Sequence, residues 1–139
     1  MDEVMVTSDG YLTQRITAKG HQFTADEPEE SGGGGLGPDP YSLLLGALGA
    51  CTSMTIQMYA KRKQYPLEKV QVRLSHARIY AKDCEECESK EGMVARIERY
   101  ITLTGALSEE QKARLLEIAG RCPVARTITS EVVIKDFLA

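Results

Sequence analysis

The chain has 139 residues, enough for one domain with a buried core and short for two, so a single domain spanning residues 1–139 is expected. Its hydrophobic content of 42% and charged content of 27% are those of an ordinary globular protein and exclude a disordered chain. A formal net charge of −3, with few and scattered aromatic residues, gives no reason to expect nucleic acid or an anionic membrane as a partner.

The N-terminus, Met1-Asp2-Glu3-Val4, has neither a positively charged start nor an apolar run. It therefore does not resemble a signal peptide, and a cytoplasmic location is expected. In a cytoplasmic chain of this size, the four cysteines are more often catalytic or metal-binding than part of a structural disulfide framework.

The first part of the chain predicts short strands at Tyr11 to Ala18 and His21 to Ala25, separated by the turn Lys19-Gly20. An acidic, glycine-rich segment follows at 27–35. Four consecutive glycines could cradle a phosphate, but no Gly-Lys-Ser/Thr follows them and the nearby charges are acidic. The segment is therefore interpreted as a flexible loop.

A long helix is predicted from about Tyr41 to Lys63, with Asp39 as its cap and Pro40 in its first position. No charged residue occurs in the stretch 41–60, which raises the question of a membrane span. Its serine, threonine, glutamine and small residues, and the half-buried strands on both sides, argue against one. A helix that is apolar nearly all round is a central buried helix, and a chain this short needs a second subunit to enclose it.

The remaining elements follow from alternation and capping signals. Alternating residues predict two strands, around Val70 to Leu74 and from Ala95 through Ile97, Arg99 and Ile101 to Leu103, joined by the charged loop Lys82 to Gly92 into an antiparallel hairpin. Further on, the sequence predicts a helix opened by the Ser108/Gln111 capping box and stopped by Gly120, a short helix from Cys122-Pro123 to about Thr129, and a closing strand from Glu131 to Phe137. This order indicates an α+β fold.

Two cysteines lie on predicted helices, and each allows two interpretations. Cys51 is surrounded by apolar or small neighbours, as an inert core thiol would be; as a nucleophile it would need a cation or base from elsewhere. Cys122 precedes Pro123, close to a helix N-terminus, where free backbone N–H groups favour a thiolate. It could equally be a simple capping residue.

Two motifs resemble one protein family. The run Gly37-Pro38-Asp39-Pro40 leading into Leu43-Leu44-Leu45-Gly46-Ala47-Leu48-Gly49-Ala50-Cys51-Thr52-Ser53-Met54 resembles the first-cysteine motif of the OsmC and organic hydroperoxide resistance superfamily. Arg121-Cys122-Pro123-Val124-Ala125-Arg126-Thr127 resembles its second-cysteine motif, 71 positions further along. The likeness extends from about Tyr11 to Ile134.

This resemblance implies an intertwined homodimer in which antiparallel sheets wrap paired central helices, with two active sites at the subunit interface. It also implies a thiol peroxidase without haem or another cofactor, acting on small organic hydroperoxides or hydrogen peroxide in oxidative or osmotic stress defence. Carried over, Cys51 would attack the peroxide and become a sulfenic acid. Cys122 would condense with it to a disulfide, which an external dithiol would reduce. Trapping the sulfenic acid requires a partner thiol nearby.

The sequence departs from the family's pattern at the position ten residues before the first cysteine. Hydroperoxide reductases of the family carry a glutamate there, paired with an arginine from the N-terminal strands, whereas this chain has Tyr41. A phenol brings no charge near neutral pH. Arg15 and Lys19 are the candidates for the cation, with Arg15 preferred because a guanidinium presents a fork of donors. Either could instead be a solvated strand or turn residue.

Cys84-Glu85-Glu86-Cys87 is a second departure. The spacing can hold zinc, but a structural site needs four ligands, and only His76 and acidic groups lie nearby in sequence. The acidic neighbours should raise the pKa values of these thiols, which weakens a redox role. Inert thiols, a metal site and an accessory redox pair all stay open.

The principal hypothesis is therefore a thiol-dependent peroxidase. The alternative is a non-catalytic small-molecule binding or redox-sensing protein that uses the same apolar pocket, and Tyr41 in place of the glutamate favours it. A zinc-binding module centred on Cys84 and Cys87 is a third possibility.

Overall fold

The computed structural model describes residues 3–139; Met1 and Asp2, the start of the segment considered as a signal peptide, lie outside them. The chain forms two compact units, one up to Gly46 and one from Ala47 to Ala139. The boundary falls within helix α1 (Pro40–Arg62), and each unit is described separately below.

The first unit contains a three-stranded antiparallel sheet in the order β1-β2-β3. Strands β2 (Gln14–Ala18) and β3 (His21–Ala25) are those predicted, with β2 beginning three residues later than expected. Lys19 and Gly20 form the turn between them, both with positive φ. Strand β1 (Val4–Ser8), which the sequence did not predict, pairs with β2 along its length.

A buried carboxylate organises the glycine-rich segment of the first unit. Asp26, 2% exposed, accepts hydrogen bonds from the Thr13 hydroxyl at 2.9 Å and from the backbone N–H of Glu27 at 2.8 Å. The N–H groups of Gly34 and Leu36 also bond to it, each at 3.3 Å. Together with a 3₁₀ turn at Glu29–Ser31, these bonds give the segment a defined path around Asp26, where a flexible loop was expected.

Helix α1 starts as predicted. An Asp39 carboxylate oxygen accepts a hydrogen bond from the backbone N–H of Ser42 at 2.7 Å, which confirms Asp39 as the cap. Within α1, the most apolar 18-residue window is one-third buried, and Met54 and Met58 are 63% and 73% exposed. By length and composition α1 could cross a membrane, but core helices of soluble proteins pass the same test, so this is weak evidence.

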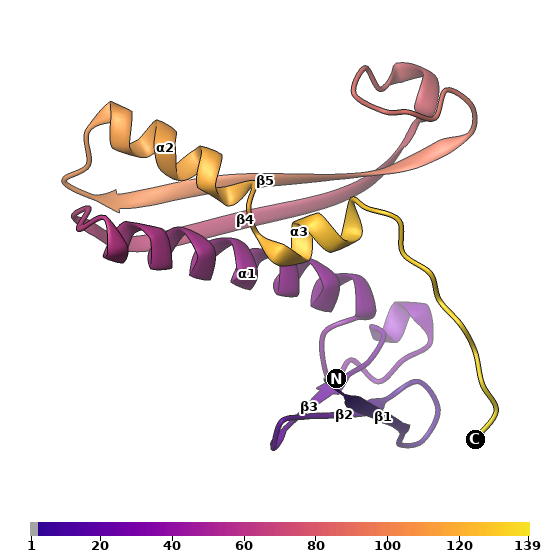
Figure 1. Cartoon of the computed structure of the whole chain (residues 1–139). Coiled ribbons are helices and arrows are strands. Elements are labelled where there is room, and N and C mark those ends of the chain that lie inside the picture. Colours follow the sequence, from indigo (N-terminus) through magenta and orange to yellow (C-terminus); the bar gives the residue numbers. More distant parts are fainter. Residues whose placement is uncertain (1–2) are drawn as a thin grey trace. The chain divides into compact units, whose positions relative to one another are not determined.

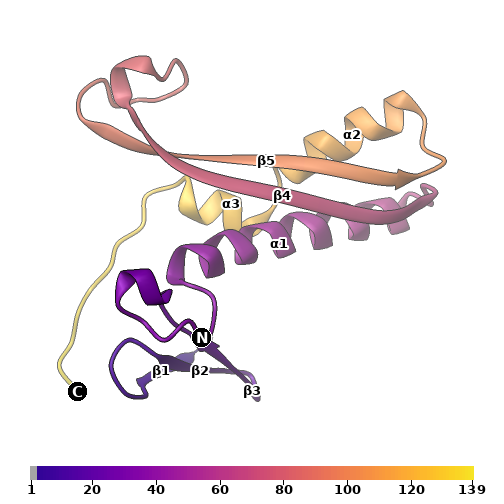
Figure 2. The same cartoon turned by 180° about the vertical axis from the view of Figure 1, so that it is seen from behind.

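The second unit is built on the predicted long hairpin. Strands β4 (Leu67–Tyr80) and β5 (Met93–Gly105) pair antiparallel from Leu67↔Gly105 to Tyr80↔Met93. They are joined through a 3₁₀ turn, η2 (Ala81–Asp83), and the acidic loop. Helix α1 from Ala47 onward, α2 (Glu109–Ala119) and α3 (Pro123–Ile128) all lie on one face of the hairpin, as two opposite views show (Figures 1 and 2).

The core of this unit is the contact between α1 and α2. Its buried members are Ile56, Tyr59 and Ala60 from α1 and Leu115, Ile118 and Ala119 from α2. Half-buried side chains of the hairpin, Val70 and Ile101 among them, pack against this cluster. At Gly49 the helix comes so close to β4 that an added Cβ would lie 2.7 Å from Leu74 Cδ1.

Both predicted caps of α2 are present, and the C-terminal one differs from expectation in its backbone conformation. Ser108 and Gln111 form both bonds of the capping box, at 3.1 and 3.0 Å. Gly120 caps the other end as expected, but with a right-handed φ of −67° rather than the left-handed conformation that glycine usually supplies there.

The predicted closing strand from Glu131 to Phe137 is wrong. Residues 131–139 have no regular secondary structure, and every one of them is exposed. Ile134 and Phe137, for example, are 82% and 86% exposed. The β-branched composition favours a strand, but a strand needs a neighbouring strand for its hydrogen bonds, and in the described chain none pairs with this segment.

Candidate redox site

The second unit brings Cys51 and Cys122 together from positions 71 residues apart in sequence. Cys51 lies on α1 and is partly exposed, whereas Cys122 is the residue before α3 and is completely buried. Both thiols are free, and their side chains lie close enough that each shifts the pKa of the other. The fold therefore brings two cysteines that are distant in sequence into one site.

Ionisation within this pair is unequal. Burial, followed by the hydrogen bond with Cys122, raises the pKa of Cys51. Burial also disfavours the charged form of Cys122. Hydrogen bonds from Cys51, the N–H of Ala125, the Thr52 hydroxyl and the N–H of Val124 outweigh it and lower the pKa of Cys122. When the pair loses one proton, the two shifts favour the thiolate on Cys122 over the thiolate on Cys51.

The N-terminus of α3 contributes to this preference as the sequence suggested. Pro123 occupies the first turn, and the Cys122 side chain makes no capping hydrogen bond. The backbone N–H groups of Ala125 and Val124 nevertheless contribute to lowering the pKa of Cys122.

Two further residues of the site were not identified from the sequence. Arg99 on β5 donates from Nη1 to the Thr52 hydroxyl oxygen at 3.0 Å and to the Ala119 carbonyl at 3.2 Å. Thr52 is completely buried beside Cys51 on α1. The available signal was Arg99 itself, a charged residue among the otherwise apolar inward positions of β5.

The three other predicted site residues, Arg15, Lys19 and Tyr41, belong to the first unit, whereas the thiol pair belongs to the second. Arg15 on β2 forms an ion pair with Asp9 at 2.8 Å, and both side chains are 58% exposed. Lys19 lies in the β2–β3 turn with a φ of 49°. Tyr41 is the second residue of α1 and is 60% exposed.

Cys84 and Cys87 form a disulfide in the loop between η2 and β5, with Cα atoms 5.4 Å apart. In this state their sulfurs are not thiolates and cannot ligate zinc. Among residues 3–139, no group of three or more histidine, cysteine, aspartate or glutamate side chains is arranged to hold a metal ion.

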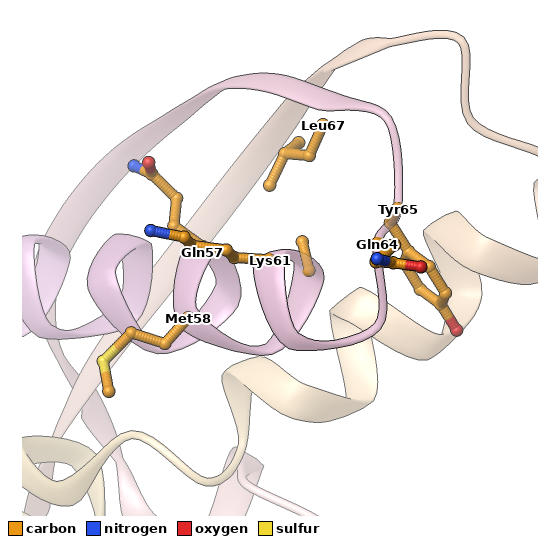
Figure 3. A pocket seen from close by; sticks show the side chains of 7 residues that line it. Gln57, Met58, Lys61, Gln64, Tyr65 and Leu67 are labelled. Carbon is orange, nitrogen blue, oxygen red and sulfur yellow. The ribbon is translucent and has the colours of Figure 1, made fainter.

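Two cavities line the C-terminal half of α1. The first, about 530 Å³, is bordered by polar side chains such as Gln57 and Gln64 together with apolar ones such as Met58 and Leu67, and its lining contains neither thiol (Figure 3). The second, about 410 Å³, lies next to the two cysteines in sequence, because its lining includes Thr55, one helical turn after Cys51, and Pro123, the residue after Cys122. Its other lining residues combine apolar and cationic side chains: Met58, Tyr59, Arg62, Ile118 and Arg121.

The α+β fold and the paired cysteines define a class of small thiol proteins, and comparison with known families identifies which one. The model of the OsmC-like protein family matches residues 32–135. The chain belongs to the OsmC-like family. No protein of curated function matches it significantly in sequence.

Solved structures share the fold at low sequence identity. An OsmC-like protein from Mycoplasma pneumoniae is 18% identical with a TM-score of 0.73, covering 93% of this chain and 87% of that one. An organic hydroperoxide resistance protein OsmC from Legionella pneumophila is 21% identical with a TM-score of 0.63, covering 91% and 88%. An organic hydroperoxide resistance protein from Elizabethkingia anophelis, with thiocyanate bound, is 16% identical with a TM-score of 0.63, covering 91% and 86%.

Proposed function

We propose that this protein is a cytoplasmic thiol-dependent peroxidase that reduces organic hydroperoxides or hydrogen peroxide in oxidative or osmotic stress defence. The observation that carries the proposal is the placement of Cys51 and Cys122 in one site, where each thiol shifts the pKa of the other. One member of the pair is partly exposed and the other is buried behind it. Hydroperoxide resistance proteins among the structures of the same fold support the substrate class.

The first step is the attack of Cys51 on the peroxide. The proton shared by the pair moves to Cys122, and the Cys51 thiolate attacks the terminal peroxide oxygen. The O–O bond breaks, Cys51 becomes a sulfenic acid, and the departing alkoxide takes up the shared proton to leave as an alcohol.

The second step closes the disulfide. The Cys122 thiolate attacks the Cys51 sulfenic sulfur, and hydroxide leaves and is protonated from solvent as water. An external dithiol then reduces the disulfide and becomes a disulfide itself, which restores both thiols. Exposure supports this division of roles, because a peroxide from solvent can reach Cys51 but not the buried Cys122.

Activation of Cys51 requires moving the thiolate from Cys122 to Cys51. A positive charge beside Cys51 would have this effect, because it favours the charged form of the nearer sulfur. We assign this role to Arg15 first and to Lys19 second, with the Tyr41 hydroxyl as a hydrogen-bonding group in place of the family's glutamate.

We further propose that the active protein is a homodimer. Large apolar side chains are exposed in three segments of the described residues: β1 (Val4, Met5, Val6), α1 (Met54, Met58) and the C-terminal segment (Val133, Ile134, Phe137, Leu138). A second copy would cover them, as the expected enclosure of the central helix requires.

Peroxide consumption and disulfide mapping test the peroxidase. The reduced protein should consume cumene hydroperoxide with a dithiol as reductant and form a disulfide between Cys51 and Cys122, identified by mass spectrometry. Cys51→Ser should abolish turnover. Cys122→Ser should stop turnover after one oxidation and leave a sulfenic acid that a dimedone-type reagent traps.

Replacing both Cys84 and Cys87 by serine provides the matched control, since it removes the other cysteine pair and should leave turnover intact. Consumption that persists without Cys51, or the absence of any disulfide between Cys51 and Cys122, would refute the proposal.

The raised pKa of Cys51 favours the second candidate, a non-catalytic binding or redox-sensing protein. That function predicts slow oxidation of Cys51, no turnover with a dithiol, and a small apolar ligand that copurifies with the protein. The same peroxide titration separates the two, because only an enzyme consumes many equivalents of peroxide per chain.

A further inference from the structure

Arg99 connects the two segments that carry the thiols. It reaches from β5, and its Nη1 atom donates both to Thr52, the residue after Cys51 on α1, and to the carbonyl of Ala119, the last residue of α2. The same Ala119 carbonyl accepts the backbone N–H of Cys122 at 3.2 Å. One guanidinium nitrogen therefore bonds to both the Cys51 helix and the turn that leads to Cys122.

The Thr52 hydroxyl donates its proton to the Leu48 carbonyl, one turn earlier, at 2.7 Å. The same side chain is one of the groups that lower the pKa of Cys122, so the Cys122 sulfur is the competing acceptor once it is ionised. Because Arg99 donates to the hydroxyl oxygen, the proton must point away from Arg99. A thiolate at Cys122 attracts that proton more strongly than a neutral carbonyl does, since a hydrogen bond to a charged acceptor is the stronger one.

Burial makes these contacts consequential. Leu48 is 3% exposed, and Thr52 and Cys122 are completely buried, so water cannot replace a missing donor at this site. Arg99 itself is part-buried, which strengthens its field at the neighbouring groups relative to an exposed arginine.

We propose that Arg99 is a positioning residue for the thiol pair: through Thr52 and the Ala119 carbonyl it holds the two cysteine-bearing segments in register and directs the Thr52 hydroxyl toward an ionised Cys122. This inference rests on the proposed peroxidase function, in which Cys122 must be a thiolate to close the disulfide. Arg99 touches neither the peroxide nor a sulfur in this arrangement and acts through Thr52.

The titratable and charged side chains of the packed elements are few. On α1 the neighbour of Cys122 is Cys51. On the sheet, Arg99 of β5 bonds to Thr52, and His76 is a half-buried residue of β4. Next to Cys122 in sequence, Arg121 and Arg126 are both exposed. Among the described residues named here, Arg99 is the charged side chain that hydrogen-bonds to a residue of the buried site.

The test measures thiolate formation directly, without peroxide. In the full chain carrying Cys84→Ser and Cys87→Ser, the ultraviolet absorbance of thiolate is followed against pH. Arg99→Met should move the ionisation midpoint of the pair upward by about one pH unit, because it removes the donor that orients the Thr52 hydroxyl, and a hydrogen bond to the charged form of a thiol lowers its pKa. It should also slow disulfide closure after a single equivalent of hydrogen peroxide roughly tenfold, as one pH unit less thiolate implies.

Two threonine variants and an arginine control on the same strand separate a positioning role of Arg99 from an effect on folding. Thr52→Val, nearly isosteric, should shift the midpoint in the same direction, and Thr52→Ser should restore it because it keeps the hydroxyl. Arg96→Met on β5, whose guanidinium pairs with Glu98 at 3.6 Å and is 54% exposed, should leave the midpoint unchanged.

An unchanged midpoint in both Arg99→Met and Thr52→Val would overturn the proposal, and the threonine pair decides it alone if Arg99→Met does not fold. These readings are independent of turnover. A protein that lacks peroxidase activity but shows the midpoint shift would refute the proposed function and keep Arg99 as a determinant of thiol ionisation.

Discussion

Asp26 and Cys122 show how single residues of this chain hold a buried negative charge. In each, burial alone raises the pKa, and donated hydrogen bonds reverse the effect and lower it. For Asp26 the donors are the Thr13 hydroxyl and the backbone N–H groups of Leu36, Glu27 and Gly34. For Cys122 they include a thiol and a hydroxyl, which makes its charge sensitive to neighbouring side chains.

The Asp26 carboxylate should control the acid stability of the first unit. Its folded-state pKa is lower than the ordinary value of 3.8, so the ionised form stabilises the fold above that pH. This contribution is lost as the pH falls through the lowered folded-state pKa. Asp26→Asn should therefore loosen the glycine-rich segment already at neutral pH and flatten the acid dependence. Amide hydrogen exchange at Gly34 and Leu36 measures both effects.

Asp9→Asn is the control for this prediction, because Asp9 is a carboxylate of the same unit whose ion pair with Arg15 is exposed. Exposed pairs contribute little to stability, so its exchange profile should resemble that of the parent protein. Equal behaviour of the two variants would contradict a special role for Asp26.

Among single residues, the sequence identified those that belong to local motifs. Cys51 and Cys122 were found because each lies in a recognisable run, and Asp39 because a cap acts within one helical turn. Arg99 and Thr52 were missed because their bond joins positions 47 residues apart, on a strand and a helix whose packing no local pattern encodes.

Among the elements, those stabilised by nearby residues were predicted and those that depend on a distant partner were not. Helix α2 and its capping box are local, as is the alternation along β4 and β5. Strand β1 and the segment 131–139 have similar β-branched composition, yet only β1 has a neighbouring strand in the described chain. Composition therefore indicates strand tendency, and pairing decides the outcome.

Oxidation should strengthen the connection between α1 and the turn from α2 to α3. A disulfide between Cys51 and Cys122 closes a loop of about 71 residues, which stabilises the folded state by about 4 kcal/mol in the chain-entropy model. In the variant carrying Cys84→Ser and Cys87→Ser, the melting temperature of peroxide-treated protein should exceed that of dithiol-reduced protein by several degrees. Cys51→Ser should remove the difference, and an equal or lower melting temperature on oxidation would contradict it.

Large apolar side chains are exposed to solvent in both units of the chain. The first unit has few buried side chains of its own, since Ile16, Ala25 and Asp26 are the buried ones among its described residues. The proposed homodimer would cover this exposed apolar surface. The sequence pointed to the same conclusion through the uncharged stretch of α1, although not to which residues would remain uncovered.

Light scattering coupled to size-exclusion chromatography should find twice the chain mass in solution. Met58→Glu places a charge on the exposed apolar side of α1 and should shift the protein toward the monomer or reduce its solubility, because a buried unpaired charge is costly in an interface. Gln71→Glu on the exposed face of β4 adds the same charge and should leave the mass unchanged. A monomeric parent protein at micromolar concentration would refute the homodimer.

The burial of Cys122 also determines which of the two sulfurs is open to irreversible oxidation. Any oxidant that diffuses in from solvent meets Cys51 first, and Cys122 reacts only once an oxidised sulfur already lies beside it. Excess peroxide should therefore accumulate sulfinic acid on Cys51 while Cys122 stays reduced. Irreversible oxidation should therefore inactivate Cys51 and leave Cys122 unmodified, so that the fraction of Cys51 present as sulfinic acid reports how much excess peroxide the protein has met.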